Sequence, residues 1–211
     1  MTSITIERYK HEELVNTISH FPGIFLSIYA FYLLMLKFPK AEFSHIVSYI
    51  IYCISFFMIY LASTLYHGTK SSDKKQFLKK VDHACIYIFM GGCYTPFVMI
   101  NMQQEYKFWY LGLIWSIVVF GVIYKFLSQY KNSILSLSLY LAFGFLCLLA
   151  KESLLNHIPS EAFKFLALGG AAYTIGAVFY AAKKIPYHHG IWHIFVLLGS
   201  ISQMWAINLT Y

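Results

Sequence analysis

The chain has 211 residues, of which 59% are hydrophobic and only 12% are charged, about half the charged share of an average soluble domain. This composition excludes an ordinary water-soluble fold, because a chain of this length cannot bury so much apolar surface. The formal net charge is +7. In so apolar a chain, we expect this charge to attract anionic lipid of the inner membrane leaflet and not nucleic acid.

Apolar stretches of about 20 residues recur along the whole chain, and their length matches a bilayer core of ~30 Å at ~1.5 Å per helical residue. These stretches are too long to be the strands of a barrel, and apolar and polar residues do not alternate along them as they do in such strands. We therefore predict an all-α membrane protein, a bundle of seven transmembrane helices that forms a single domain over residues 1–211. The expected spans are roughly 19–37, 43–66, 81–101, 108–127, 132–150, 162–182 and 189–210.

The leader before the first span differs from that of a secretory signal peptide. It carries acidic as well as basic residues, and no cleavage pattern of small residues follows the span. We expect the first span to remain as a transmembrane helix. The four cysteines also lie inside expected spans without C-x-x-C spacing, which predicts buried apolar residues and not disulfides or thiolate ligands.

The distribution of Lys and Arg predicts the orientation of the bundle. If the N-terminus is cytoplasmic, the cytoplasmic segments hold eleven of the 16 basic residues, five of them between the second and third spans. Because basic residues favour the cytoplasmic side, we expect a cytoplasmic N-terminus and a C-terminus outside the cell. The protein would then be a multi-pass protein of the cell membrane.

Four of the expected spans carry polar residues at their cytoplasmic ends. These are Glu13, Asn16 and His20 at the first span, Ser63 and His67 at the second, Asp82 and His83 in the first turn of the third, and His188, His189 and His193 at the seventh. Ionisable groups at membrane depth are costly, and they usually face the interior of the bundle and carry function. We expect these residues to form one layer.

Three histidines of this layer predict a metal site. His189 and His193 are four residues apart, so they share one face of a helix. His67 reaches the same depth from the second span, with Asp82 beside it. Three histidine nitrogens and a water form the open tetrahedral arrangement of catalytic zinc. The lack of a thiolate favours zinc over an iron–sulfur cluster or Cu(I), while other divalent ions stay open.

Four segments resemble one protein family. The segments "EELVNTISHFPG", "STLYH", "DHACIYIFMGGCYTPF" and "GAVFYAAKKIPYHHGIWHIFVLLGS" follow one another in order, and they are similar to the haemolysin III family. This family is the bacterial branch of the progestin and adipoQ receptors, within a superfamily of membrane-embedded hydrolases. The resemblance covers residues 12 to about 205, and it implies a location in the bacterial plasma membrane.

The resemblance also implies roles for individual residues. His67, His189 and His193 would bind zinc, Asp82 would orient the metal-bound water, and Ser63 lies beside it. The family often carries a further histidine where this chain has Gln203. That position is not one of the three ligands, so the expected zinc site is unaffected.

A zinc-activated water next to a carboxylate predicts a hydrolase. Because the site would lie near the membrane surface, we expect a lipid amide or ester as the substrate and a function in membrane lipid homeostasis. The resemblance supports this through the ceramidase-like activity described for the eukaryotic receptors. Membrane lipids are therefore the expected substrate or ligand.

Two other functions stay open. In the first, zinc only joins the second, third and seventh helices of a non-catalytic protein that acts as a receptor or regulates membrane fluidity. In the second, the chain forms a cytolytic pore, as the family name implies. The pore is disfavoured because the spans carry no polar stripe along their length. A retinal protein is excluded because the seventh span has no lysine after Lys184.

Overall fold

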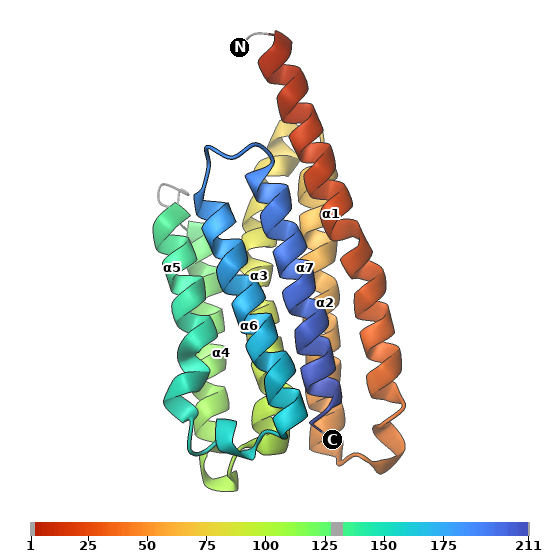
Figure 1. Cartoon of the computed structure of the whole chain (residues 1–211), viewed down its shortest axis with the longest axis vertical. Helices are drawn as coiled ribbons and strands as arrows, with labels where there is room; N and C mark the ends of the chain where they lie inside the picture. The colour runs from red at the N-terminus through yellow and green to blue at the C-terminus, as the bar shows by residue number, and fades with distance from the viewer. Residues whose placement is uncertain (1–2, 128–132, 211) are drawn as a thin grey trace.

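The computed structural model describes residues 3–127 and 133–210 as a bundle of antiparallel helices (Figure 1). Within these ranges lie seven α-helices, which confirms the predicted all-α fold. They are α1 (Ser3–Met35), α2 (Phe43–Gly68), α3 (Ser72–Asn101), α4 (Gln104–Leu127), α5 (Ser133–Gly144), α6 (Ser160–Ala181) and α7 (His188–Asn208). Three short 3-10 helices occur in the same ranges: η1 (Phe38–Lys40), η2 (Phe145–Ala150) and η3 (Leu155–His157).

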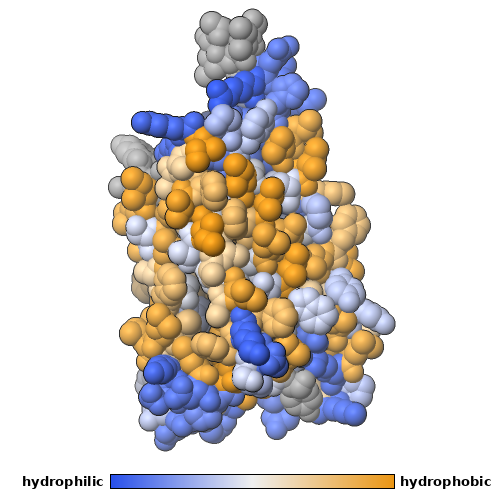
Figure 2. Space-filling view, in the orientation of Figure 1, coloured by the Kyte–Doolittle hydropathy of each residue, from blue (hydrophilic) through white to orange (hydrophobic). Residues whose placement is uncertain are grey.

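The outer surface of the bundle is suited to lipid. Six of the helices are long and apolar enough to cross a membrane, and α5 with η2 adds a shorter apolar helix, Ile134–Ala150. Large apolar side chains such as those of Phe120, Leu168 and Val178 face outward. Figure 2 shows a hydrophobic belt between two hydrophilic ends. So much exposed apolar surface is a liability in water but is matched by lipid tails, and the chain is a multi-pass membrane protein.

Helix α3 lies at the centre of the packing and contacts α2, α4, α5 and α7. The buried face of α2 follows one line of residues spaced three and four apart, which places them on one side of a helix. This line consists of Tyr49, Tyr52, Phe56, Tyr60, Ser63 and His67. The aromatic residues fill the core, and the same face carries Ser63 and His67 to the end of the bundle where α7 begins.

Glycines let several of the helices approach one another closely, as two of them show. A Cβ atom at Gly92 would collide with the Ser55 side chain, and one at Gly190 would lie 2.8 Å from Cγ1 of Val15. Small residues at such positions let helices in membranes pack closely. Gly190 therefore lets the start of α7 lie directly against α1.

Two helices begin earlier than the expected spans. Helix α1 begins at Ser3 and not near residue 19, and α3 begins at Ser72 and not near residue 81. The prediction that Asp82 lies in the first turn of its helix is therefore wrong, because Asp82 is ten residues beyond Ser72. Hydropathy marks only the part of a helix at membrane depth. The polar residues before it are good helix formers and extend both helices.

The fifth span also differs from one continuous helix. Helix α5 ends at Gly144 and continues as the 3-10 helix η2. The Tyr94 hydroxyl group donates to the carbonyl oxygens of Phe143 and Gly144, both at 2.9 Å, and accepts from the Cys147 N–H at 3.1 Å. A side chain inserted into the helical hydrogen bonds in this way distorts the helix. The expected first residue of this span, 132, lies outside the described residues.

The orientation of the bundle in the membrane stays a prediction, and reporter fusions test it. The connection between α2 and α3 lies at the same end as the N-terminus, and the C-terminus lies at the other end (Figure 1). A fusion after residue 70 should report the cytoplasm, whereas fusions after residues 103 and 211 should report the outside. The first and last fusions on the same side would contradict a seven-span topology.

Candidate metal centre

Three histidines from two helices converge at one end of the bundle. His67 lies near the end of α2, and His189 and His193 lie in the first two turns of α7. One ligand nitrogen of each residue lies within 4.8 Å of those of the other two. The ring centroid of His67 is 5.1 Å from those of both His189 and His193. The three residues predicted as ligands from the sequence are therefore together and could hold a metal ion.

The free nitrogens of these rings fit a metal ion. His193 is fully buried, His67 is nearly so, and His189 is half-buried. In each ring the Nε2 atom is buried and, within the described part of the chain, has no hydrogen-bond partner. A buried polar atom without a partner is costly. One metal ion bound by three Nε2 atoms would satisfy all of them at once.

Helix α1 sets the proton position on His193. The Nδ1 atom of this ring lies 3.1 Å from the carbonyl oxygen of Asn16 and 3.0 Å from Oγ of Ser19. A carbonyl oxygen only accepts hydrogen bonds, so Nδ1 carries the proton of the neutral ring. The lone pair is then on Nε2, where it is available to a metal ion.

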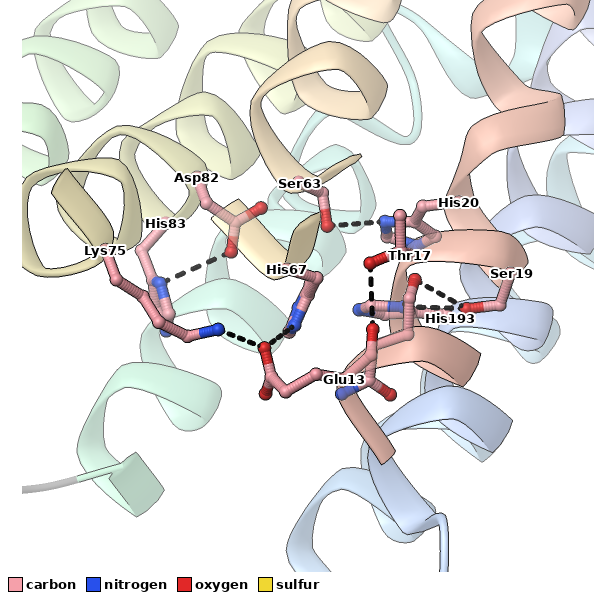
Figure 3. A network of polar contacts seen from close by, with 11 residues as sticks. Glu13, Thr17, Ser19, His20, Ser63, His67, Lys75, Asp82, His83 and His193 are labelled. Atoms are coloured by element: carbon pink, nitrogen blue, oxygen red, sulfur yellow. Dashed lines mark hydrogen bonds and ion pairs between the residues drawn. The ribbon is translucent and has the colours of Figure 1, made fainter. Parts of the chain in front are cut away.

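A carboxylate from α1 determines which ring nitrogen of His67 donates a hydrogen bond. The Nδ1 atom of His67 lies 3.2 Å from Oε2 of Glu13. Because a carboxylate accepts, Nδ1 is the donor, and in the neutral ring that a metal ion requires the lone pair is then on Nε2. The ammonium group of Lys75, from the first turn of α3, pairs with the same carboxylate oxygen (Figure 3). Metal-binding histidines commonly have such an acceptor on their second nitrogen.

Asp82 lies beside the three histidines but not among them. Its side chain is buried on α3 and lies next to those of Ser63 and His67 in Figure 3. Its Oδ2 atom is 3.5 Å from Nδ1 of His83, which itself donates to the Lys79 carbonyl oxygen at 2.7 Å. In the described residues, the group with metal-ligand spacing contains the three histidines and not Asp82.

Ser63 contacts a fourth histidine, which is buried and is not one of the three candidate ligands. Its Oγ atom lies 2.8 Å from Nδ1 of His20, which comes from α1. The His20 ring stacks on His193 with a centroid distance of 3.5 Å and an angle of 19° between the planes. The His20 ring also meets the ring of Tyr60 edge-on, at a centroid distance of 5.0 Å. His20 thus packs between the core of the bundle and the metal site.

The sequence indicates the α1 residues of this site but not their roles. Glu13, Asn16, Ser19 and His20 form a pattern in the segment EELVNTISHFPG, at positions i, i+3, i+6 and i+7. In the structure, each of the four contacts one of the residues predicted for the site. The spacing of the pattern is the signal, since it places these positions on adjoining faces of one helix.

Two further polar residues of α7 lie apart from the metal-ligand group. His188 is the first residue of the helix, and its ring centroid is 6.2 Å from that of His189. Gln203 is ten residues beyond His193 and is buried against α6, where a Cβ atom at Gly169 would lie 2.8 Å from its Nε2 atom. Neither residue belongs to the three-histidine group found in the described ranges.

The fold and this site define a multi-pass helical membrane protein with a buried three-histidine centre. Residues 8–204 match the family described as haemolysin-III related, and the chain belongs to that family. It is 36% identical over 197 residues to the hemolysin-3 homolog of Bacillus subtilis (strain 168), a match that covers 93% of this chain and 92% of the relative. It is 32% identical over 208 residues to hemolysin-3 of Bacillus cereus, with 98% and 94% covered.

A human protein is also similar. The monocyte to macrophage differentiation factor of Homo sapiens is 30% identical over 165 residues, which cover 74% of this chain and 67% of the relative. No solved structure matches the chain.

Substitution of single histidines tests the metal site. Replacing His67, His189 or His193 by Ala should remove stoichiometric metal from protein that still inserts and purifies, because three ligands to one ion do not tolerate the loss of one. Metal analysis of the purified protein measures this. His188→Ala is the matched control and should keep the metal. Loss of metal in the control with full retention in His189→Ala would show that the wrong face of α7 has been assigned.

Proposed function

We propose that the protein is a zinc-dependent hydrolase that cleaves an amide or ester bond of a membrane lipid and acts in membrane lipid homeostasis. The observation that carries this proposal is the set of three histidine ligands with a buried carboxylate next to it and outside it. Structural zinc usually has four protein ligands, whereas catalytic zinc has three and keeps one position open. The three-histidine set supports the catalytic kind.

Zinc is favoured by the chemistry of the ligands. Neutral imidazole nitrogens suit zinc, and the four cysteines are free and lie apart from the histidine group. When bound, zinc would polarise the bond to be cleaved and activate a water for attack at neutral pH. His67, His189 and His193 would hold the ion through their Nε2 atoms.

Asp82 and Ser63 supply the proton chemistry of this proposal. The Asp82 carboxylate takes a proton from the attacking water and later returns it to the leaving amine or alcohol. The Ser63 hydroxyl group, held by His20 at 2.8 Å, lies beside that carboxylate and orients it. Burial of both side chains keeps bulk water away from the proton that is being transferred.

The position of the site favours a lipid as the substrate. The histidines lie at the end of α2 and the start of α7, towards the end of the bundle that carries the N-terminus (Figure 1). In a membrane, a site near the end of the transmembrane helices would be level with the boundary between lipid headgroup and acyl chain. The bond that joins a headgroup or backbone to an acyl chain would therefore be within reach.

The two other functions are less well supported. A purely structural zinc would favour a fourth protein ligand, and Asp82 lies outside the group with ligand spacing. The name of one relative, hemolysin-3, favours a cytolytic pore. However, the aromatic face of α2 is fully buried against its neighbours, which argues against an open channel through this bundle.

An Asp82→Asn variant separates a catalytic from a structural metal. The amide keeps the size of the side chain but is a poor base, so zinc content and thermal stability should stay near those of the wild type. Hydrolysis should fall by the ~10²–10⁴-fold typical of losing a positioned base. The measurement is the release of fatty acid from vesicles of host lipid, followed by mass spectrometry.

Asp73→Asn is the control for this experiment, because Asp73 is an exposed carboxylate in the first turn of the same helix. It should leave hydrolysis unchanged. An Asp82→Asn protein with full zinc and undiminished lipid hydrolysis would rule out Asp82 as the base. Loss of zinc together with stability in this variant would instead favour a structural metal.

A further inference from the structure

We propose that Glu13 is a positioning residue that sets the metal affinity of the three-histidine site, although it contacts no metal itself. It acts by holding the His67 ring in one tautomer and one orientation. The inference rests on the metal site of the proposed function but does not require that the protein be an enzyme.

The contact between Glu13 and His67 joins α1 to α2 at a position with little exposure to solvent. The side chain of His67 is only 2% exposed and that of Glu13 is 17% exposed. The carboxylate is 3.2 Å from Nδ1 of the ring, and within the described residues no partner competes for Nε2. Without Glu13, the proton could move to Nε2 or the ring could turn, and either change would remove the lone pair from the metal position.

Lys75 holds Glu13 in place for this role. Its ammonium group pairs with the same Oε2 atom that accepts from His67. The ammonium also lies 5.2 Å from the ring centre of Tyr66 and 5.7 Å from that of Tyr9, which adds cation–π attraction. The pair balances the charge of a carboxylate near membrane depth and aims it at His67.

A charged acceptor also makes the imidazole a stronger ligand. A carboxylate that accepts from the second nitrogen raises the basicity of the ligating nitrogen. His193 receives its fixed tautomer from the backbone carbonyl of Asn16, which no substitution removes. Glu13 is therefore a side chain through which metal affinity can change while all three ligands stay in place.

The experiment measures the zinc affinity of the full-length protein in detergent by competition with a chelator. Glu13→Ala should weaken zinc binding by about 10–100-fold, the usual effect of losing such a partner. Glu13→Gln keeps an acceptor without the charge and should weaken binding less than Glu13→Ala. Cobalt absorption spectra of the same variants report whether the ligand geometry around the metal has changed.

Two further variants serve as controls for the zinc affinities of the Glu13 variants. Glu12→Gln changes the neighbouring carboxylate, which pairs with Arg8 at 3.1 Å on the surface, and should leave zinc affinity unchanged. Ser19→Ala should have a small effect, because the Asn16 carbonyl oxygen still accepts from His193.

The thermal stability of the metal-free protein separates positioning from packing. In the positioning role, metal-free Glu13→Gln melts near the wild type while its zinc affinity falls. Lower stability with unchanged zinc affinity would overturn the inference, as would equal affinity of Glu13→Ala and wild type. A wild-type protein that binds no zinc would overturn the metal site itself, which is a distinct result.

Discussion

A polar group buried in a membrane bundle is costly unless it finds a partner, and this cost explains how one end of the molecule is organised. Glu13, His67 and Lys75 come from three different helices and satisfy one another. His193 does the same with the backbone of α1 at Asn16. Within the described residues, the Nε2 atoms of His67, His189 and His193 have no hydrogen-bond partner after these contacts, and together they could hold a metal ion.

Helix α1 supports the site without supplying one of the three histidines. Its early start at Ser3 keeps Glu13, Asn16 and His20 in one continuous helix, so their spacing becomes a fixed geometry. Gly190 lets α7 approach closely enough for these contacts. The metal site therefore depends on the helices that carry its histidines and on the helix packed across them, which is consistent with a family match that begins at residue 8.

The arrangement separates two kinds of chemistry. The three histidines lie together as candidate metal ligands, and the buried carboxylate of Asp82 lies next to them with Ser63 and His83 as neighbours. A carboxylate outside the ligand set is available to move protons, while one inside it is not. The proposed hydrolase activity of this haemolysin-III related protein requires such a carboxylate, next to the ligands but outside the ligand set.

The sequence by itself determined the class of fold, because apolar stretches of membrane length permit few structures other than helices. It also determined the metal-ligand candidates, since His189 and His193 share a helix face at any tilt or rotation of the bundle. Only the tertiary structure decided what surrounds them. The pairing of Glu13 with His67, the early start of α3 and the break of α5 by Tyr94 all lie beyond the apolar pattern. The contact of Glu13 with His67 and that of Tyr94 with the end of α5 join helices that are distant in sequence. Local periodicity carries no information on such contacts.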